Sequence, residues 1–164
     1  MLSRKLFVMG GIESETLELL NSFRSSFDVQ MFDSQMNYIL AHIVENVCMS
    51  LTNYVLGRNH EQCVILIEDF DLKLPLPKNL ENRGPIDGFS EGYCAVIRQN
   101  YPEVVAHELL HAAFGVDDCY DEKTLDNLRS CDDSRCVMRY GNKQGIHICS
   151  SIRHQVNEFE SQFN

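Results

Sequence analysis

Five consecutive residues, His107-Glu108-Leu109-Leu110-His111, have the spacing of a metal site. On a helix, residues i and i+4 lie on one face, so both imidazoles can bind one ion while Glu108 lies beside it. Zinc binds such nitrogen ligands, and catalytic zinc sites keep one coordination position open for water. The metal lowers the pKa of that water, and a neighbouring carboxylate can accept its proton. The pattern therefore predicts a catalytic zinc bound by His107 and His111, with Glu108 as the general base.

A third zinc ligand is expected shortly after this helix. Gly115 allows the helix to end and the chain to turn, and Asp117 and Asp118 follow it. A glycine and then a ligand after H-E-x-x-H resembles the metzincin peptidases, with their pattern H-E-x-x-H-x-x-G-x-x-(H/D). Counted from the glycine, the resemblance implies Asp118 as the ligand; counted from His107, it implies Asp117. We favour Asp118, because the glycine fixes the turn and one extra helical residue shifts glycine and ligand together.

A second motif, Cys131-Asp132-Asp133-Ser134-Arg135-Cys136-Val137-Met138, resembles the archaemetzincins, small zinc peptidases of the metzincin clan. In that family the methionine forms a tight turn under the metal, and Met138 matches it. In some other metzincins a tyrosine two residues later approaches the zinc, so the resemblance implies that Tyr140 can help to stabilise an oxyanion. It implies a zinc-dependent metalloprotease that hydrolyses a peptide or protein substrate. The alternative is a catalytically inactive or non-hydrolytic zinc-binding domain on the same fold, although such a domain would not require Glu108.

The sequence departs from the family pattern around the cysteines. Ser130 stands where the family has a histidine directly before C-x-x-x-x-C, and an insertion that contains Cys119 precedes Cys131. The final C-x-x-C of the family is also incomplete, because Ile152 stands three residues after Cys149. One ligand of the family's structural zinc site is therefore missing.

We expect Cys119 to replace that ligand. The predicted second, structural zinc is then bound by four thiolates, from Cys119, Cys131, Cys136 and Cys149. Either His147 or His154 as the fourth ligand is one alternative, and two disulfides among the four cysteines are another.

Strand and helix patterns alternate around these motifs. Apolar runs predict strands at 6–9, 29–32, 63–67 and 93–98, and helical spacing predicts helices at 14–27, 36–55, 102–114 and 150–163. The run at 63–67 is the most strand-like and is expected at the centre of a sheet, whereas prolines and glycines predict a long irregular loop over 68–91. By analogy with the metzincin clan, the strand at 93–98 is the sheet edge that pairs with an extended peptide.

These patterns predict one metallopeptidase domain over 1–164, of the α/β (α+β) zincin, metzincin-like class. Its N-terminal subdomain, 1–115, has a twisted mixed sheet, flanking helices and the zinc helix. Its small irregular C-terminal subdomain, 116–164, has the Met-turn and a terminal helix. The chain length of 164 residues agrees with a single domain.

Composition limits the partners and the compartment. The 14 basic and 24 acidic residues give a net charge of −10, so the chain lacks the basic footprint expected for nucleic acid or an anionic membrane surface. No apolar stretch has the length of a membrane span, and the N-terminal region lacks the apolar core of a signal peptide, which predicts a cytoplasmic protein. In that compartment the seven cysteines divide into four metal ligands and three core thiols, Cys48, Cys63 and Cys94.

Overall fold

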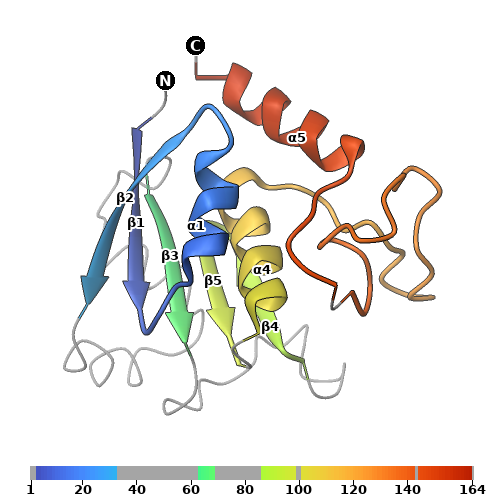
Figure 1. The fold of residues 1–164 in the computed structure, drawn as a ribbon, viewed down its shortest axis with the longest axis horizontal. Coiled ribbons are helices and arrows are strands. Elements are labelled where there is room, and N and C mark those ends of the chain that lie inside the picture. Colours follow the sequence, from blue (N-terminus) through green and yellow to red (C-terminus); the bar gives the residue numbers. More distant parts are fainter. Residues whose placement is uncertain (1–2, 33–62, 69–85, 99–100, 143, 164) are drawn as a thin grey trace.

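The computed structural model describes residues 3–32, 63–68, 86–98, 101–142 and 144–163, which form a mixed α/β fold (Figure 1). Its elements are, in chain order, β1 (Ser3–Met9), α1 (Ser14–Asn21), β2 (Ser26–Phe32), β3 (Cys63–Glu68), β4 (Gly88–Glu91), β5 (Cys94–Ile97), α4 (Pro102–Phe114) and α5 (Ser150–Ser161). The strands predicted at 6–9, 29–32, 63–67 and 93–98 coincide with β1, β2, β3 and β5. The helix predicted at 36–55 and Cys48 lie outside the described residues.

The sheet has the strand order β2-β1-β3-β5-β4. β2, β1, β3 and β5 are parallel neighbours, and β4 pairs antiparallel with β5. β3 therefore occupies the central position that the sequence predicts for it. The prediction that 93–98 forms the edge was wrong, because β4 lies outside β5 and is the edge strand on that side of the sheet that the described residues form.

β4 also corrects the end of the irregular loop predicted over 68–91, whose residues 69–85 lie outside the described residues. Gly88–Glu91 folds back on β5 as a hairpin, with Phe89 opposite Val96. Gly92 provides the turn with a φ of 55°, a backbone conformation that glycine adopts readily. The pairing with a completely buried strand, β5, stabilises β4, which is only four residues long.

Helix α1 is shorter than predicted. The apolar spacing suggested a helix from Ser14 to Phe27, but the helix ends at Asn21 and Phe27 belongs to β2. Phe27 pairs with Arg4 in the parallel β1–β2 ladder. A helix that continued to Phe27 would lose the β1–β2 pairing, so strand pairing determines the conformation of this segment.

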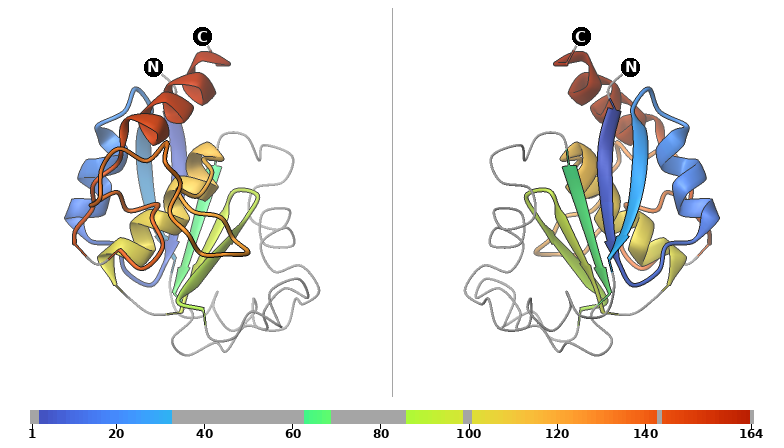
Figure 2. Two further views of the ribbon diagram at one scale, coloured as in Figure 1. Left: turned by 90° about the vertical axis from the view of Figure 1, so that its right-hand side faces the viewer. Right: turned by 90° about the vertical axis from the view of Figure 1, so that its left-hand side faces the viewer.

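The helices α1, α4 and α5 lie on one face of the sheet (Figures 1 and 2). Helix α4 packs between the sheet and α5, and its buried side chains include Val105, Leu109, Leu110 and Phe114. Pro102 suits the first turn, where no backbone N–H donor is needed. The helix ends at Gly115, which has a φ of 62° and donates its N–H to the carbonyl of His111 at 2.8 Å.

A buried charge connects the end of α4 with β1 and α5. Arg4 is 1% exposed and donates to the carbonyl of Ala113, one of the last carbonyls of α4. Its guanidinium also lies over the rings of Phe27, Phe114 and Phe159, at 5.3 to 5.8 Å from their centroids. A cation at the C-terminal end of a helix interacts favourably with the helix dipole. This contact therefore stabilises the last turn of α4, which carries His111.

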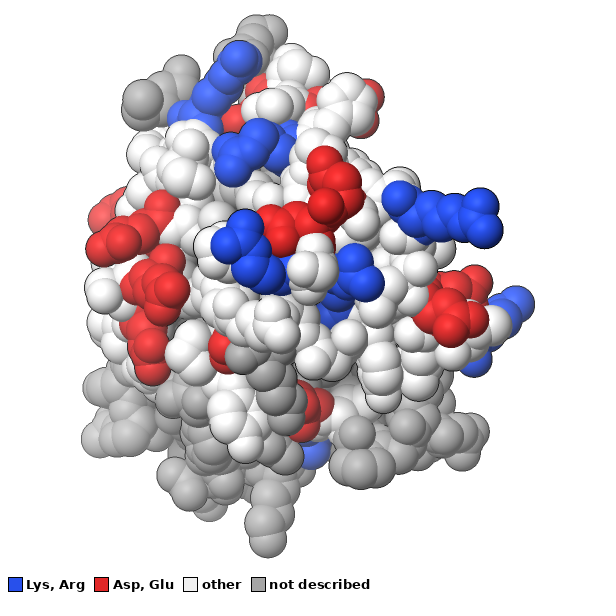
Figure 3. Space-filling model, turned by 45° about the vertical axis from the view of Figure 1, so that its right-hand side comes forward, with Lys and Arg blue, Asp and Glu red and all other residues white. Residues whose placement is uncertain are grey.

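The described C-terminal part consists of irregular chain at 116–142 and 144–149, followed by α5 (Figure 1). Glu160 on α5 is buried and accepts hydrogen bonds from the backbone N–H and hydroxyl of Ser25, at 2.5 and 2.8 Å. On the face in Figure 3, acidic and basic side chains are intermixed. Among the described residues, no helix is long and apolar enough to cross a membrane.

Candidate metal centres

His107 and His111 project from the same face of α4. Their Nε2 atoms lie 3.1 Å apart, and their ring centroids are separated by 4.7 Å. The spacing of four residues produces this pairing directly, because it spans about one helical turn. Helix α4 thus presents two nitrogen donors to one point, as the sequence predicts.

Asp118 supplies a third donor at the same point. Its Oδ1 lies 3.1 Å from His107 Nε2 and 3.2 Å from His111 Nε2. The left-handed turn at Gly115 reverses the chain after α4 and brings this carboxylate back over the histidines. Asp117 is not part of the group, and its backbone N–H donates to Gln155 on α5 at 2.8 Å. The structure therefore brings together His107, His111 and Asp118. This is the set expected when the third ligand is counted from Gly115.

Backbone carbonyls orient both histidine rings. His107 Nδ1 lies 3.0 Å from the carbonyl oxygen of Val137, and His111 Nδ1 lies 2.6 Å from that of Val116. Because a carbonyl only accepts, each Nδ1 carries the proton in the neutral ring and each Nε2 keeps its lone pair. This second layer of contacts prepares both Nε2 atoms to bind a cation.

The three groups are also coupled electrostatically. Burial acts to lower the pKa of His107, but the hydrogen bond with Asp118 and the charge of Glu108 outweigh it and raise that pKa to about 9. Burial acts to raise the pKa of Asp118, but hydrogen bonds from both histidines hold it well below its usual range. The site thus strongly favours positive charge between the imidazoles and the carboxylate.

Glu108 lies beside the three donors and is only 8% exposed. Burial raises the pKa of its carboxyl group, against the opposing effect of His107 and His111. Strand β4 encloses this side chain: Ser90 hydrogen-bonds to it, and a Cβ atom added at Gly88 would lie 2.9 Å from Glu108 Cγ. Gly88 is therefore needed for the close approach of the edge strand to Glu108.

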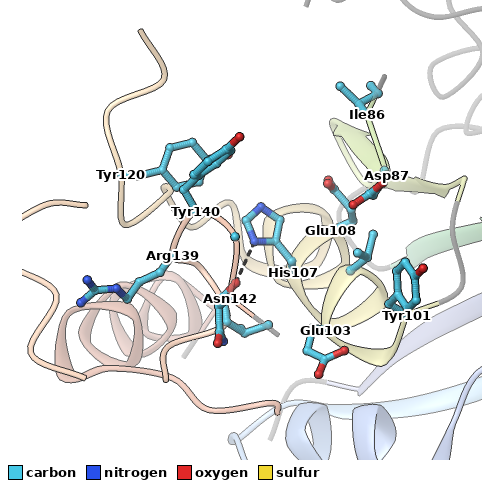
Figure 4. Close-up of a pocket in the computed structure, with 14 residues that line it drawn as sticks. Ile86, Asp87, Tyr101, Glu103, His107, Glu108, Tyr120, Arg139, Tyr140 and Asn142 are labelled. Atoms are coloured by element: carbon cyan, nitrogen blue, oxygen red, sulfur yellow. Dashed lines mark hydrogen bonds between the residues drawn. The ribbon is translucent and has the colours of Figure 1, made fainter. Parts of the chain in front are cut away.

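Two cavities open on this centre. The larger, of about 490 Å³, has a largely apolar wall that includes Ile86, Tyr101, Val104 and Tyr140 (Figure 4). The smaller, of about 390 Å³, is lined by more polar groups, among them Asp117 and Glu122. Gly88, His107, Glu108 and Tyr120 border both cavities. The donors thus face space large enough for a ligand.

Two tyrosines stand on the side of the larger cavity opposite Glu108 (Figure 4). Tyr140 lines it and is 53% exposed, and its ring packs against that of Tyr120 with centroids 5.5 Å apart. Tyr120 is more enclosed: burial, the charges of Asp118 and Glu108 and a hydrogen bond to Asp118 raise its pKa. The only mark of Tyr120 in the sequence is its position two residues after Asp118.

Met138 lies in a tight turn, as the resemblance implies. The N–H of Arg139 donates to the carbonyl of Cys136 at 3.1 Å, which closes a turn around Val137 and Met138. The Met138 side chain is completely buried in the core. The same turn presents the Val137 carbonyl to His107, so it supports the histidine site through its backbone.

The four cysteines of the C-terminal part form a second centre. Cys119, Cys131, Cys136 and Cys149 are all buried, and their sulfur atoms lie within 4.8 Å of one another. They could bind a metal ion. Cys119 Sγ lies 3.6 Å from Cys149 Sγ and 3.9 Å from Cys136 Sγ, and all four are free thiols, not disulfides.

Neither histidine considered as a fourth ligand joins the cysteine group. His154 is exposed on α5 and lies 3.4 Å from Glu158, and His147 forms a backbone bridge with Cys136. A hydrogen bond from Cys119 lowers the pKa of Cys136 to about 5, and burial raises that of Cys149 to about 11. Of the three expected core thiols, Cys94 is buried in β5.

No protein-family model, curated protein or solved structure matches this chain.

Proposed function

We propose that this protein is a zinc-dependent peptidase with a zincin-type fold, formed as one domain by residues 1–164. The observation that carries the proposal is the convergence of His107 Nε2, His111 Nε2 and Asp118 Oδ1 beside the buried carboxylate of Glu108. Three protein ligands next to a cavity are typical of catalytic zinc, whereas structural zinc is enclosed by four. A carboxylate at such a site can act as a general base.

The spacing of the donors supports zinc as the ion. Zinc bonds to nitrogen and oxygen are roughly 2.0–2.1 Å long, so the ligand atoms of a regular tetrahedron lie roughly 3.3 Å apart. The three distances among His107 Nε2, His111 Nε2 and Asp118 Oδ1 are 3.1, 3.1 and 3.2 Å. The neutral imidazoles and the carboxylate thus match the preferred donor types and separations of this ion. An aspartate ligand makes the site one unit more negative than a third histidine would.

Zinc bound here would acidify a water molecule and polarise the carbonyl of the scissile peptide bond. Glu108 takes the proton of the attacking water as its oxygen bonds to the carbonyl carbon. The same carboxyl group then returns the proton to the leaving nitrogen as the C–N bond breaks. The position of Glu108 beside the three donors suits both steps, because the group must reach the attacking water and then the leaving nitrogen. We also propose that Tyr140, which lines the larger cavity, helps to stabilise the charge on the carbonyl oxygen.

We propose that the peptide substrate binds in extended form along β4, the edge strand, and not along β5. An edge strand offers unpaired backbone donors and acceptors to an added strand. Gly88 and Ser90 of β4 both approach Glu108, so a peptide paired with β4 would pass over the general base. The apolar wall formed by Ile86, Val104 and Tyr140 would then contact side chains next to the scissile bond.

For the cysteine centre we propose a second, structural zinc. Zinc–sulfur bonds of roughly 2.3 Å give tetrahedral sulfur–sulfur distances of roughly 3.8 Å. The Cys119–Cys149 and Cys119–Cys136 distances of 3.6 and 3.9 Å agree with this value. Four buried thiols enclose the point completely, as is typical of structural sites. Reduced thiols are stable in a reducing compartment, which supports a cytoplasmic location.

A non-hydrolytic zinc-binding domain is the alternative. It would use the same His107, His111 and Asp118 ligands without needing a base. The enclosed position of Glu108 beside the three donors favours the enzyme, because a general base must lie next to the metal-bound water, whereas a site that only holds an ion has no need of a further carboxylate there.

The test compares the zinc-loaded wild type with Glu108→Gln on a library of quenched fluorescent peptides, with zinc per chain measured for both. We expect the variant to keep its zinc and to lose about 10²–10⁴-fold in kcat, the usual contribution of a general base. Glu18→Gln, the same chemical change at an exposed position of α1, is the matched control and should retain full activity.

Equal hydrolysis by wild type and Glu108→Gln would refute the mechanism. A zinc-loaded wild type that cleaves no member of the library would favour the non-hydrolytic domain.

A further inference from the structure

Tyr120 lies where the two cavities meet. It borders both of them together with His107 and Glu108, whereas Tyr140 borders only the larger one. Figure 4 shows the Tyr120 and Tyr140 rings side by side, across the cavity from Glu108 and with His107 between. The Tyr120 side chain therefore adjoins the space between a candidate metal ligand and the proposed general base.

The backbone holds Tyr120 in this position from both sides. Tyr120 forms an antiparallel bridge with Asn127, and the flanking Cys119 carbonyl accepts a hydrogen bond from Leu128 at 2.8 Å. Asn127 also accepts a hydrogen bond from the N–H of Tyr140 at 3.2 Å. The hairpin that carries Tyr120 is thus fastened to the segment that follows Met138. Such a framework can hold a side chain still enough to act as a preorganised donor.

The two neighbours of Tyr120 in the chain strengthen this placement. Asp118 belongs to the histidine centre, and Cys119 belongs to the cysteine centre. Asp118 and Tyr120 border the same cavity, while Cys119 between them is buried among the other sulfur atoms. Metal binding by both residues 118 and 119 would therefore fix the direction in which Tyr120 points.

We propose that Tyr120 is a further catalytic residue, whose hydroxyl donates a hydrogen bond to the oxyanion that forms when water attacks the substrate carbonyl. The inference rests on the proposed peptidase function and deepens it. A phenol donates one hydrogen bond, so the Tyr120 hydroxyl, which hydrogen-bonds to Asp118, must turn to the oxyanion when that charge forms. A donor at an enclosed site stabilises the developing negative charge more than water does. The step transfers no proton to or from the phenol.

Tyr140 contributes less in this arrangement. Its side chain is 53% exposed, so its hydroxyl competes with bulk water for any charge in the cavity. Its ring contact with Tyr120, at 5.5 Å between centroids, instead limits the motion of the inner tyrosine.

The experiment compares Tyr120→Phe and Tyr140→Phe in the full-length, zinc-loaded protein. We expect Tyr120→Phe to lower kcat by about 100-fold with an unchanged KM, since one oxyanion donor contributes about 10²–10³-fold. Its affinity for a phosphinic peptide, which mimics the tetrahedral intermediate, should fall in parallel. Tyr140→Phe should lose less than Tyr120→Phe in both measurements. Tyr93→Phe, in the turn between β4 and β5, controls for the loss of a tyrosine hydroxyl elsewhere.

Zinc content and thermal unfolding, measured for each variant, distinguish a direct effect on catalysis from a loss of metal or of folded protein. Unchanged kcat in Tyr120→Phe, or a larger loss in Tyr140→Phe, would overturn the proposal. Loss of zinc from Tyr120→Phe would also overturn it, because the residue would then act through Asp118 and not on the substrate. Recovery of part of the lost kcat in Tyr120→His, which restores a donor, would support it. A wild type that hydrolyses no peptide refutes the peptidase function itself, an outcome distinct from all of these.

Discussion

The two candidate centres differ in how completely the protein encloses them. The cysteine centre has four donors, all buried. The histidine centre has three donors, whose side chains are 17–19% exposed, and it opens on two cavities. A closed set of four thiolates can only hold an ion, whereas an open set of three leaves a position for water or substrate. The contrast therefore suggests a division between a stabilising centre and a reactive one.

The centres are nevertheless neighbours in the chain. Asp118 and Cys119 are consecutive residues in different centres. Cys136 directly precedes Val137, whose carbonyl contacts His107 at 3.0 Å, and Met138 accepts a hydrogen bond from Cys119 at 2.8 Å. The cysteine centre thus positions two groups of the histidine centre, Asp118 and the Val137 carbonyl. The two histidines are positioned independently by α4, which packs on the sheet. Disruption of the cysteine centre should therefore impair metal binding at the histidine centre more than the reverse.

The largest effect is expected from Cys136→Ser. Structural zinc contributes about 10–16 kcal/mol of binding free energy in small zinc-finger peptides, so its loss should disorder residues 116–149. Asp118 and the Val137 carbonyl would then leave the histidines, and metal per chain should fall from two to none. Elemental analysis and hydrogen exchange measure both effects.

Cys94→Ser is the control for this change, because Cys94 is buried in β5 and belongs to neither of the two candidate centres that the described residues form. It should cost about 1–3 kcal/mol of stability and leave both metals in place. A Cys136→Ser variant that keeps an intact histidine centre would contradict the proposed direction of coupling.

His111→Ala tests the opposite direction. Loss of one of three ligands should reduce metal affinity at the histidine centre by more than about 100-fold, since even indirect partners of a metal contribute 10–100-fold. The cysteine centre should retain its ion, so metal per chain should fall to one and hydrolysis should stop. His154→Ala, on the exposed side of α5, should alter neither. Loss of both metals from His111→Ala would contradict the expectation that the cysteine centre does not depend on the histidine centre.

Asp118→Asn and Asp117→Asn compare the proposed third ligand with its neighbour in the chain, which is outside the donor group. Asp118→Asn removes the charge whose oxygen lies 3.1 and 3.2 Å from the histidines, and we expect affinity to fall about 10–100-fold. Asp117→Asn should leave affinity unchanged, since Asp117 lies outside the donor group. Competition with a zinc-binding dye gives both values, and equal losses would mean that Asp117 shares the ligand role.

The smallest effect is expected from Gly88→Ala. The added Cβ would meet Glu108 Cγ at 2.9 Å and the Val96 carbonyl at 3.1 Å, so β4 must shift. Overpacking of this kind costs about 1–3 kcal/mol. We expect a lower kcat with full zinc content, measured by hydrolysis and elemental analysis. Unchanged kcat would show that the position of Glu108 does not depend on β4.

The sequence predicted those parts of the molecule that depend on neighbours in the chain. The histidine pair follows from helical spacing, and the end of α4 follows from Gly115, whose backbone conformation few other residues adopt easily. The apolar runs of β1, β2, β3 and β5 were identifiable for the same reason, because burial in a sheet leaves a local pattern.

The edge position of β4, the early end of α1 and the role of Tyr120 were not predictable in this way. Gly88–Glu91 carries a turn-like sequence and becomes a strand only by pairing with β5. Phe27 fits a helical pattern but pairs with β1. In both cases a ladder formed with a distant segment outweighs the weak local preference of the sequence.

The sequence by itself thus determined the donor types and the local spacing of His107, Glu108 and His111. Only the tertiary structure decided between Asp117 and Asp118, gathered four cysteines spread over 119–149 and brought Tyr120 to the cavity. The physical reason is the range of the interactions. Helical geometry is set within a few residues, whereas the path of an irregular loop is set by the distant groups that it contacts.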